Sequence, residues 1–481
     1  MEGTEKIVVG LDIGTTKICA VVGRKDKNGK LEVLGVGKAI SDGVIRGIVS
    51  NLDRTTEAIE KAISQASKES NVNISKVNVG IAGQHINSSF QHGSITRENS
   101  EEVISVEDVE NLQNDMHRLV VQPGCEIIHA MPQDYVVDHN ESVSDPVGMT
   151  GIKLEGNFHI ITARTTAIKN IDKCVEQAAL TRGELILEPL ASAMAVLSSE
   201  EKEAGVCLVD IGGGTTDIAI FHDNIIRHTA VIPLGGNIIT DDIKQGLQVM
   251  TQQAEALKTK FGSAMPDEAS EYELVTIPGL RERASKDISV KNLSSVIGSR
   301  MEEIIELIHH HILDSGCAKQ LSAGIVITGG GALLHNLKPL MELMTGLEVR
   351  IGYPNEYLGK SETEEVKSPI FATAMGLVLA GFRSIDERQD RYIRIRSKKA
   401  QVSEPAVVQP APIEQEPVRP APVAARTATT TTTTHQGGRR TTRPVAQPQP
   451  QAAAPEPEKK TNVFNKLFNQ VRTFLVEDEE V

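Results

Sequence analysis

A run of three glycines and two threonines directly follows an apolar stretch near the middle of the chain. Residues 205–209 are apolar, and residues 210–217 read Asp-Ile-Gly-Gly-Gly-Thr-Thr-Asp. Glycine lets the backbone turn tightly and present its N–H groups to an anion, and threonine hydroxyls add donors. Asp210 would repel a phosphate, so its carboxylate suits Mg²⁺ or the water around it. The stretch predicts a phosphate-binding turn, with a plain Gly-rich hairpin turn as the alternative.

The same pattern occurs near the N-terminus. Residues 7–11 are apolar, and residues 12–17 read Asp-Ile-Gly-Thr-Thr-Lys. Two such turns far apart in one chain predict a duplicated domain, in which each half contributes one phosphate loop to a shared cleft.

A third glycine run, residues 329–331, ends the apolar stretch 324–328. The close backbone approach that glycine permits would admit a flat base and its ribose at this point. The sequence contains neither a Walker A loop nor a Gly-x-Gly-x-x-Gly fingerprint with its downstream acidic residue, which excludes P-loop and Rossmann-type sites.

Composition places the chain among large cytosolic proteins. Its 481 residues suffice for roughly two to four domains. Apolar residues make up 40% of the chain and aromatic residues only 3%, so the core must be mainly aliphatic. A net charge of −14 argues against a general nucleic-acid-binding protein. Five scattered cysteines without a Cys-x-x-Cys pair are typical of reduced thiols. We expect no signal peptide, and no apolar run that approaches the roughly 20 residues of a membrane-spanning helix.

Strand-like and helix-like stretches alternate along the chain, which predicts an α/β fold. Apolar periodicity predicts helices at residues 52–69, 168–180, 240–248, 251–261 and 290–312. Residues 84–164 are more polar, and within them we expect a helix at 106–119 and strands at 125–130, 133–137 and 157–162. Glu255 and Lys258 stand one helical turn apart. If they bind no ligand, this spacing predicts an ion pair on the helix surface.

The sequence changes character again after about residue 397. Residues 397–461 are rich in Pro, Ala, Gln and Thr, a composition that cannot bury enough apolar surface to fold. A flexible chain of this length has a root-mean-square span of roughly 40–50 Å. We therefore interpret this segment as a disordered tether.

Hydrophobic residues return at 462–476 with helical spacing. Seven of them form one apolar stripe: Val463, Phe464, Leu467, Phe468, Val471, Phe474 and Leu475. A helix of this length spans about 22 Å, too short for a bilayer core of about 30 Å. The stripe therefore predicts an amphipathic helix that lies in the membrane interface, with docking onto the core or a partner protein as the alternative. The acidic residues 477–480 would be repelled by anionic lipid, so we expect modest affinity that depends on multiple copies.

Five of these stretches together resemble one superfamily. Residues 12–17, 210–217 and 328–331 look like the phosphate 1, phosphate 2 and adenosine motifs of the actin/Hsp70/sugar-kinase ATPases. Residues 188–193 (Glu-Pro-Leu-Ala-Ser-Ala) and 372–376 (Ala-Thr-Ala-Met-Gly) resemble the two connecting helices between the halves. Within that superfamily, residues 5–385 resemble the bacterial FtsA family of cell-division proteins.

This resemblance implies an actin-like fold of two related domains around a nucleotide cleft. It implies domain 1A at residues 1–83 and 165–203, and an FtsA-type subdomain 1C inserted at 84–164. It further implies domain 2A at 204–241 and 313–396, with subdomain 2B at 242–312. The disordered linker at 397–461 and the amphipathic membrane-targeting helix at 462–476 would follow.

The resemblance also implies ATP and Mg²⁺ as ligands. The implied nucleotide contacts are Asp12, Gly14, Thr15, Thr16, Lys17, Asp210, Gly212, Gly213, Gly214, Thr215, Glu255, Lys258, Gly329, Gly330 and Gly331. Asp12 and Asp210 would face Mg²⁺ through water, and Glu188 would position the attacking water in a hydrolysis that is at most slow.

The implied partners are the tubulin-like protein FtsZ, further copies of the chain, later division proteins and the cytoplasmic face of the cell membrane at the division site. Arg300 matches the position at which the family receives the FtsZ tail, and a solvated Arg on a helix is the alternative. Two other functions remain open: a membrane adaptor of the pilus-assembly type, and a phosphotransferase resembling a sugar kinase.

Overall fold

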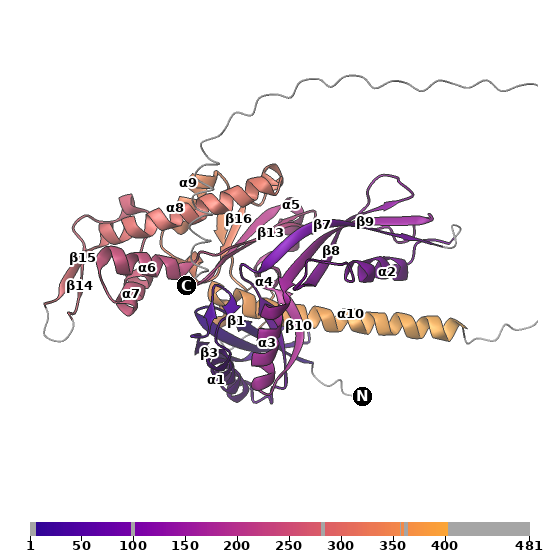
Figure 1. Ribbon diagram of the computed structural model, residues 1–481, viewed down its shortest axis with the longest axis horizontal. Coiled ribbons are helices and arrows are strands. Elements are labelled where there is room, and N and C mark those ends of the chain that lie inside the picture. Colours follow the sequence, from indigo (N-terminus) through magenta and orange to yellow (C-terminus); the bar gives the residue numbers. More distant parts are fainter. Residues whose placement is uncertain (1–5, 98–101, 280–283, 356, 360–363, 403–481) are drawn as a thin grey trace, which may run out of the picture. The chain divides into compact units, whose positions relative to one another are not determined.

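Two five-stranded sheets with the same topology form the two halves of the fold (Figure 1). The computed structural model describes residues 6–97, 102–279, 284–355, 357–359 and 364–402, with side chains described as far as residue 390. In the first sheet, the order β10-β6-β1-β2-β3 is antiparallel among β1, β2 and β3 and parallel among β1, β6 and β10. The second sheet, β13-β12-β11-β16-β17, repeats this pattern strand for strand. The repeat confirms the predicted duplication.

The strands of both sheets are short, and the central ones are mostly buried, as their apolar runs predict, whereas the edge strands are only partly buried. The first sheet consists of β1 (Ile7–Ile13), β2 (Lys17–Lys25), β3 (Leu31–Ile40), β6 (Lys76–Ile81) and β10 (Thr181–Leu187). The second consists of β11 (Val206–Ile211), β12 (Thr216–His222), β13 (Ile225–Ile232), β16 (Ile325–Thr328) and β17 (Val349–Ile351). Two small hairpins accompany them, formed by β4 (Val44–Ile45) with β5 (Ile48–Val49) and by β14 (Leu274–Ile277) with β15 (Lys286–Ser289).

Each half is covered in part by a helix that follows the strands of the other half. Helix α4 (Glu188–Val196) follows β10 of the first sheet but contacts β11 and β12, whereas α10 (Ala372–Val402) follows the second sheet and contacts β1 and β2. The two helices pack tightly, because a Cβ on Gly376 would lie 1.8 Å from the carbonyl oxygen of Ala191. One apolar cluster therefore joins residues of both sheets through α4 and α10.

The other helices cover the outer faces of the sheets. On the first half these are α1 (Leu52–Ser70) and α3 (Thr165–Gln177), which share a core with β1, β2 and β6. On the second half these are α6 (Gly236–Leu247), α7 (Thr251–Phe261), α8 (Val290–Asp314) and α9 (Leu337–Thr345), with the short α5 (Ser199–Ala204) next to β12.

The polar segment after β6 forms a separate small sheet. Its strands β7 (Ile86–Thr96), β9 (Lys153–Arg164) and β8 (Cys125–Val137) lie in the order β7-β9-β8, and α2 (Val106–Met116) packs on one face over its own apolar cluster. We call this unit the inserted subdomain. The two short strands expected at 125–130 and 133–137 are one strand, β8, with register shifts that absorb the interruption.

Several predicted boundaries are displaced. Helix α7 has the predicted bounds, but α3 runs from Thr165 to Gln177 because Ala179, in the left-handed region at φ 57°, ends it early. Helix α6 begins at Gly236, four residues before the prediction, after the extended Gly235. Helix α10 continues to Val402, past the expected linker boundary at 397.

One described helical stretch, Pro369–Asp390, is long and apolar enough to cross a membrane by length and composition. The expectation that no apolar run approaches such a length was therefore wrong. Most of this stretch is buried inside the protein (61% of its apolar window), where α10 contacts the first sheet and α4. The predicted amphipathic helix at 462–476 lies outside the described residues.

Candidate functional site

The two predicted phosphate turns have the same geometry and lie in direct contact. In each, the N–H of the first glycine donates to the carbonyl three residues later: Gly14 to Lys17 at 3.1 Å and Gly212 to Thr215 at 2.9 Å. A Cβ placed on Gly213 would lie 1.8 Å from Thr16 Oγ1. The glycines therefore let the two turns approach each other, and phosphates can enter between them only if the turns separate.

Four buried or half-buried carboxyl groups surround this contact. Asp12 ends β1 and Asp210 ends β11, as the duplication requires, while Asp217 lies on β12. Glu188 begins α4 directly after β10, where Pro189 in the first turn favours a helix start. Three segments distant in sequence thus converge on one small volume.

This convergence raises the pKa of each carboxyl group. Burial raises the pKa of Asp12, and the nearby Lys17 ammonium offsets the effect only in part. Burial and repulsion from Asp210 raise the pKa of Asp217 to about 8. Burial also holds the pKa of Glu188 well above its usual range, and the neighbouring aspartates add to the shift. The site lacks enough protein cations to balance its carboxylates, so it would favour a bound cation.

Lys17 serves this cluster rather than extending into open space. Its Nζ lies 3.5 Å from Asp12 Oδ2 and donates to the carbonyl of Ile370 at 2.7 Å, over the ring of Phe371. Burial is the largest single influence and would lower the pKa of Lys17, but attraction to Asp12 together with smaller contributions from Cys19 and Asp210 raises the pKa. The Lys17 side chain therefore links Asp12 to the residues directly before α10.

Two side chains that the sequence analysis did not single out hold Asp210 in place. Ser192 Oγ, on α4, donates to Asp210 Oδ2 at 2.6 Å, and Thr373 Oγ1, on α10, donates to the same oxygen at 3.3 Å. The sequence could have indicated both residues, because they lie inside the two connecting-helix motifs, 188–193 and 372–376. Through these bonds, both connecting helices contact the second phosphate turn.

The backbone of the first residues of α6 donates hydrogen bonds to the second phosphate turn. The N–H of Gly236 donates to the carbonyl of Gly212 at 2.9 Å, and the N–H of Asn237 donates to that of Gly213 at 2.8 Å. Lys258 Nζ donates to the carbonyl of Gly236 at 2.8 Å. The sequence analysis did not assign this segment to the site.

Glu255 and Lys258 form the predicted i, i+3 ion pair, at 2.7 Å between Lys258 Nζ and Glu255 Oε2. Both groups also bond the hydroxyl of Thr240 on α6, at 2.5 Å for Glu255 and 2.8 Å for Lys258. The Lys258 side chain is only 13% exposed. The pair is thus more than a solvated surface contact: it ties α7 to the N-terminus of α6, next to the second turn.

The third glycine run packs onto the end of β11. Gly329 has φ of +81°, which favours glycine, and a Cβ on it would lie 2.3 Å from Asp210 Oδ1. A Cβ on Gly331 would lie 2.3 Å from Ile211 Cγ2. Gly330 differs, since it is exposed and its nearest neighbour would be 4.0 Å away. Gly329 and Gly331 allow close packing, and only Gly330 presents open backbone to a flat ligand.

Mg-ATP fits the residues that are present. Glycine turns from both halves offer backbone N–H groups, and a buried carboxylate atom, Asp217 Oδ1, has no hydrogen-bond partner within the described residues. The described part of the chain contains no group of three or more His, Cys, Asp or Glu side chains placed to hold a metal ion directly. The implied role of Asp12 and Asp210, contact with Mg²⁺ through water, stays a prediction.

A surface pocket lies away from this cluster. Its volume is about 320 Å³, and it lies between α10 and the turn that joins β2 to β3, next to Lys25, Leu31, Tyr357 and Phe382. Its lining includes none of the predicted site residues.

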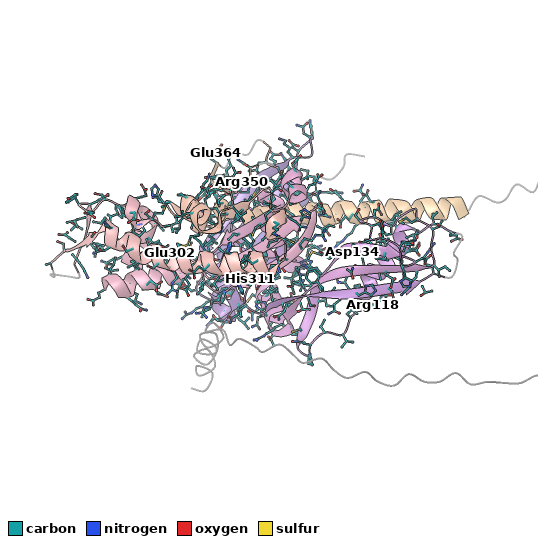
Figure 2. The ribbon with its side chains drawn as sticks, turned by 90° about the horizontal axis from the view of Figure 1, so that it is seen from above. Arg118, Asp134, Glu302, His311, Arg350 and Glu364 are labelled. Carbon is teal, nitrogen blue, oxygen red and sulfur yellow. The ribbon has the colours of Figure 1, made fainter. Side chains whose placement is uncertain are left out.

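Arg300, the predicted partner residue, is engaged within the protein. Its Nε and Nη2 atoms form a two-pronged ion pair with Asp242 of α6, at 2.6 and 3.2 Å, and Nη1 contacts Glu303. Figure 2 labels Glu302 and His311 on the same helix, α8. The guanidinium thus cross-links α8 to α6, and an acidic partner would have to compete with Asp242.

The comparisons with known proteins agree on one family. Residues 207–376 match the family described as "Cell division protein FtsA", and residues 83–162 match "SHS2 domain inserted in FTSA". The second match covers the inserted subdomain.

Curated relatives extend the match over most of the chain. Cell division protein FtsA of Pseudomonas aeruginosa is 39% identical over 378 residues, which cover 79% of this chain and 90% of the relative. The protein of the same name from Escherichia coli K12 is 36% identical over 386 residues, covering 79% and 91%. Among solved structures, a PilM–PilN type IV pilus biogenesis complex shares the fold, with a TM-score of 0.56 at 15% identity over 78% of this chain and 98% of that chain.

Proposed function

The chain belongs to the FtsA family of cell division proteins, and from this we propose that it binds Mg-ATP between its two halves, assembles with further copies on the cytoplasmic face of the cell membrane, and anchors the FtsZ ring at the division site. Later division proteins would be recruited to the same assembly. The single observation that best supports nucleotide binding is the contact of two glycine turns within a cluster of carboxyl groups.

Each predicted contact has a role in this proposal. The turns at Gly14 and Gly212 would hold the phosphates from opposite sides, and Gly330 with the Glu255–Lys258 pair would hold the nucleoside. Mg²⁺ supplies positive charge against the phosphates and the surrounding carboxylates when it is bound. Because the turns touch, their separation and return would couple nucleotide occupancy to the angle between the halves.

Glu188 is the proposed group that orients the attacking water. Burial and the neighbouring aspartates raise its pKa, which disfavours the carboxylate form that would accept a proton from water. A cation near Asp12 and Asp210 would lower the pKa of Glu188 and restore the carboxylate. Turnover should therefore be slow, and it should be lost in Glu188→Ala and in Glu188→Gln.

Attachment to the membrane is assigned to residues 462–476, and the FtsZ tail to the region of Arg300. The family match does not favour the two alternatives, a pilus-assembly adaptor and a phosphotransferase. A phosphotransferase would also have no need for the tether and the apolar stripe that this sequence carries near its C-terminus.

Reconstitution with vesicles tests the proposal. Purified full-length chain, anionic phospholipid vesicles, FtsZ and Mg-ATP are mixed and the vesicles are sedimented. FtsZ should pellet with the vesicles only when the full-length chain is present, and not when residues 462–481 are deleted. Equal amounts of pelleted FtsZ with and without the chain would contradict the anchoring function.

A further inference from the structure

Strand β7 of the inserted subdomain has the features of a pairing edge, and we propose that it joins the β7 strand of a second copy of this chain, antiparallel, across a two-fold axis. The inference names one contact of the self-assembly proposed above and rests on it. The two small sheets would become one continuous six-stranded sheet, because each contributes three strands.

Strand β7 lies at the end of its sheet. In the order β7-β9-β8, it pairs with β9 over all 11 residues without a register shift, from Ile86 opposite Ala163 to Thr96 opposite Lys153. No other described strand pairs with it. The inserted subdomain and its β7 edge can be followed in Figure 1.

The register shows which backbone groups face the open edge. The N–H of Arg97 donates to the carbonyl of Ile152 at 2.8 Å, which continues the pairing one residue past the strand. In an antiparallel pair, alternate residues direct both backbone polar groups to the same neighbour. The odd-numbered residues 87–97 therefore face β9, and the even-numbered residues face outward.

Those outward groups have no partner over most of the strand. Within the described residues, the backbone N–H and C=O groups of Phe90, His92, Ser94 and Thr96 make no recorded hydrogen bond. Only the beginning of β7 is approached from that side, where the Ser88 hydroxyl donates to the carbonyl of Thr229 at 3.4 Å. A free stretch of about seven residues, roughly 24 Å long, remains.

The chemistry of the strand leaves this edge unprotected. Soluble proteins guard edge strands with charged side chains, proline or a bulge. Strand β7 reads INSSFQHGSIT and has no Lys, Arg, Asp, Glu or Pro, and its register is regular. The next residue, Arg97, is turned inward with its side chain only 8% exposed, and it pairs with Asp108 of α2. The large apolar side chain of Phe90 is 61% exposed.

A second copy fits this edge better than a charged peptide. A two-fold pair sets the strand against a second copy of itself, so any net charge on the strand would meet a like charge, and like charges opposite each other destabilise such a pair. The strand carries no Lys, Arg, Asp or Glu, although the chain as a whole has a net charge of −14. Two copies can thus meet at β7 without the repulsion that most of their surfaces would impose, and Phe90 would be covered.

Three variants at one position test the contact. Ser94→Lys places two like charges near the axis, and Ser94→Pro removes an outward N–H while leaving the bonds to β9 intact. Ser94→Thr, the matched control, keeps an uncharged hydroxyl. In sedimentation equilibrium of the full chain, we expect self-association at least tenfold weaker for the first two variants and unchanged for the control. Melting curves by circular dichroism check that each variant is folded.

A cysteine scan gives a readout that misfolding cannot imitate. Side chains opposed in a sheet share a face, so a two-fold antiparallel pair always sets one residue against itself. Single cysteines at positions 90–95, in a chain with Cys125→Ser, should cross-link strongly at one position and weakly at its neighbours.

The possible failures can be told apart. If the wild-type chain associates and the Ser94 variants associate equally well, or if the scan shows no dominant position, the β7 contact is wrong and self-assembly stands. If the wild-type chain remains monomeric with and without ATP, both ideas fail. Cross-linking of β7 to an extended peptide of another protein instead of to itself would also overturn the inference.

Discussion

The side chain of Asp217 shows how the site costs stability when it has no ligand. Its Oδ2 accepts a hydrogen bond from Thr215 Oγ1 at 3.1 Å, whereas its buried Oδ1 has no partner among the described residues. Burial and the nearby Asp210 raise its pKa from 3.8 to about 8. A carboxyl with a raised folded-state pKa binds its proton more tightly in the fold than in the unfolded chain. Its contribution to stability is therefore present at low pH and is lost as the pH rises through about 8.

Asp217→Asn should remove this pH dependence. At pH 8.5 and without nucleotide, we expect the variant to be more stable than the wild type by on the order of 1–3 kcal/mol, because an amide is never ionised. At pH 5 the difference should be clearly smaller, because the destabilisation of the wild type builds up between pH 3.8 and about 8. Urea unfolding at both pH values, with the exposed Asp267→Asn as control, measures the effect. A constant difference between variant and wild type at both pH values would contradict the assignment.

Gly213→Val should abolish ATP binding. The added side chain would occupy the space where Thr16 Oγ1 now lies, 1.8 Å from the ideal Cβ, and would block backbone approach to a phosphate. Isothermal calorimetry measures the affinity, and Gly213→Ala supplies a milder change. Gly246→Ala is the matched control, since its Cβ would meet only Val296 Cγ2, at an ordinary 3.5 Å. Wild-type affinity in Gly213→Val would refute the phosphate-turn assignment.

Among the elements, α8 packs the second half, and in the proposed function it would also bind the FtsZ tail through the same Arg300 side chain. Its buried face, including Leu293, Ile297 and Ile304, packs into the core of the second half, while Arg300 reaches α6 through Asp242. Both partners of this ion pair are about one quarter exposed, so the pair contributes little stability, about 1 kcal/mol or less. A cross-link this weak can yield to an acidic peptide that offers more contacts.

A charge exchange separates these two roles. Arg300→Glu should weaken binding of an FtsZ tail peptide, but it also sets two acidic groups against each other. The double variant Arg300→Asp with Asp242→Arg restores the ion pair and inverts the charge at position 300. Fluorescence anisotropy with the labelled peptide should show weak binding for both variants, with near-native melting temperature only for the double variant. Full binding by the double variant would place the partner site elsewhere.

On the scale of the whole molecule, two helices join the two halves of the fold. Helices α4 and α10 each contact strands of the other half, and both reach Asp210 through Ser192 and Thr373. A change at the phosphate turns therefore has a direct route to both connecting helices. Residues 462–476, which we propose to target the membrane, follow a long polar segment in the sequence, so their removal should leave this arrangement intact.

Phe464→Glu with Phe468→Glu should release the chain from vesicles without loss of ATP binding. Each buried apolar side chain contributes roughly 1.5–3 kcal/mol at most, and ordering the helix offsets part of that. A single copy should bind weakly, and assembly should strengthen attachment by placing many helices on one surface. Co-sedimentation measures this, with deletion of residues 477–481 as a control that should increase binding to anionic vesicles. A double variant that pellets as the wild type does would exclude this helix as the anchor.

The sequence by itself determined the features that depend on neighbouring residues. An apolar run followed by Asp, Gly and Thr specifies a buried strand and a tight turn, and its repetition predicted the duplication that the two sheets confirm. Helical periodicity likewise located α7 and most of α8, because the 3.6-residue repeat is a local property.

Only the tertiary structure decided which distant residues meet. The convergence of Asp12, Glu188, Asp210 and Asp217, with the resulting pKa shifts, depends on pairing among strands and helices far apart in the chain. The open edge of β7 likewise depends on which strand takes the last place in the sheet. Periodicity records how a segment is buried but not what it is buried against, so periodicity alone predicts neither the pKa shifts nor the open edge.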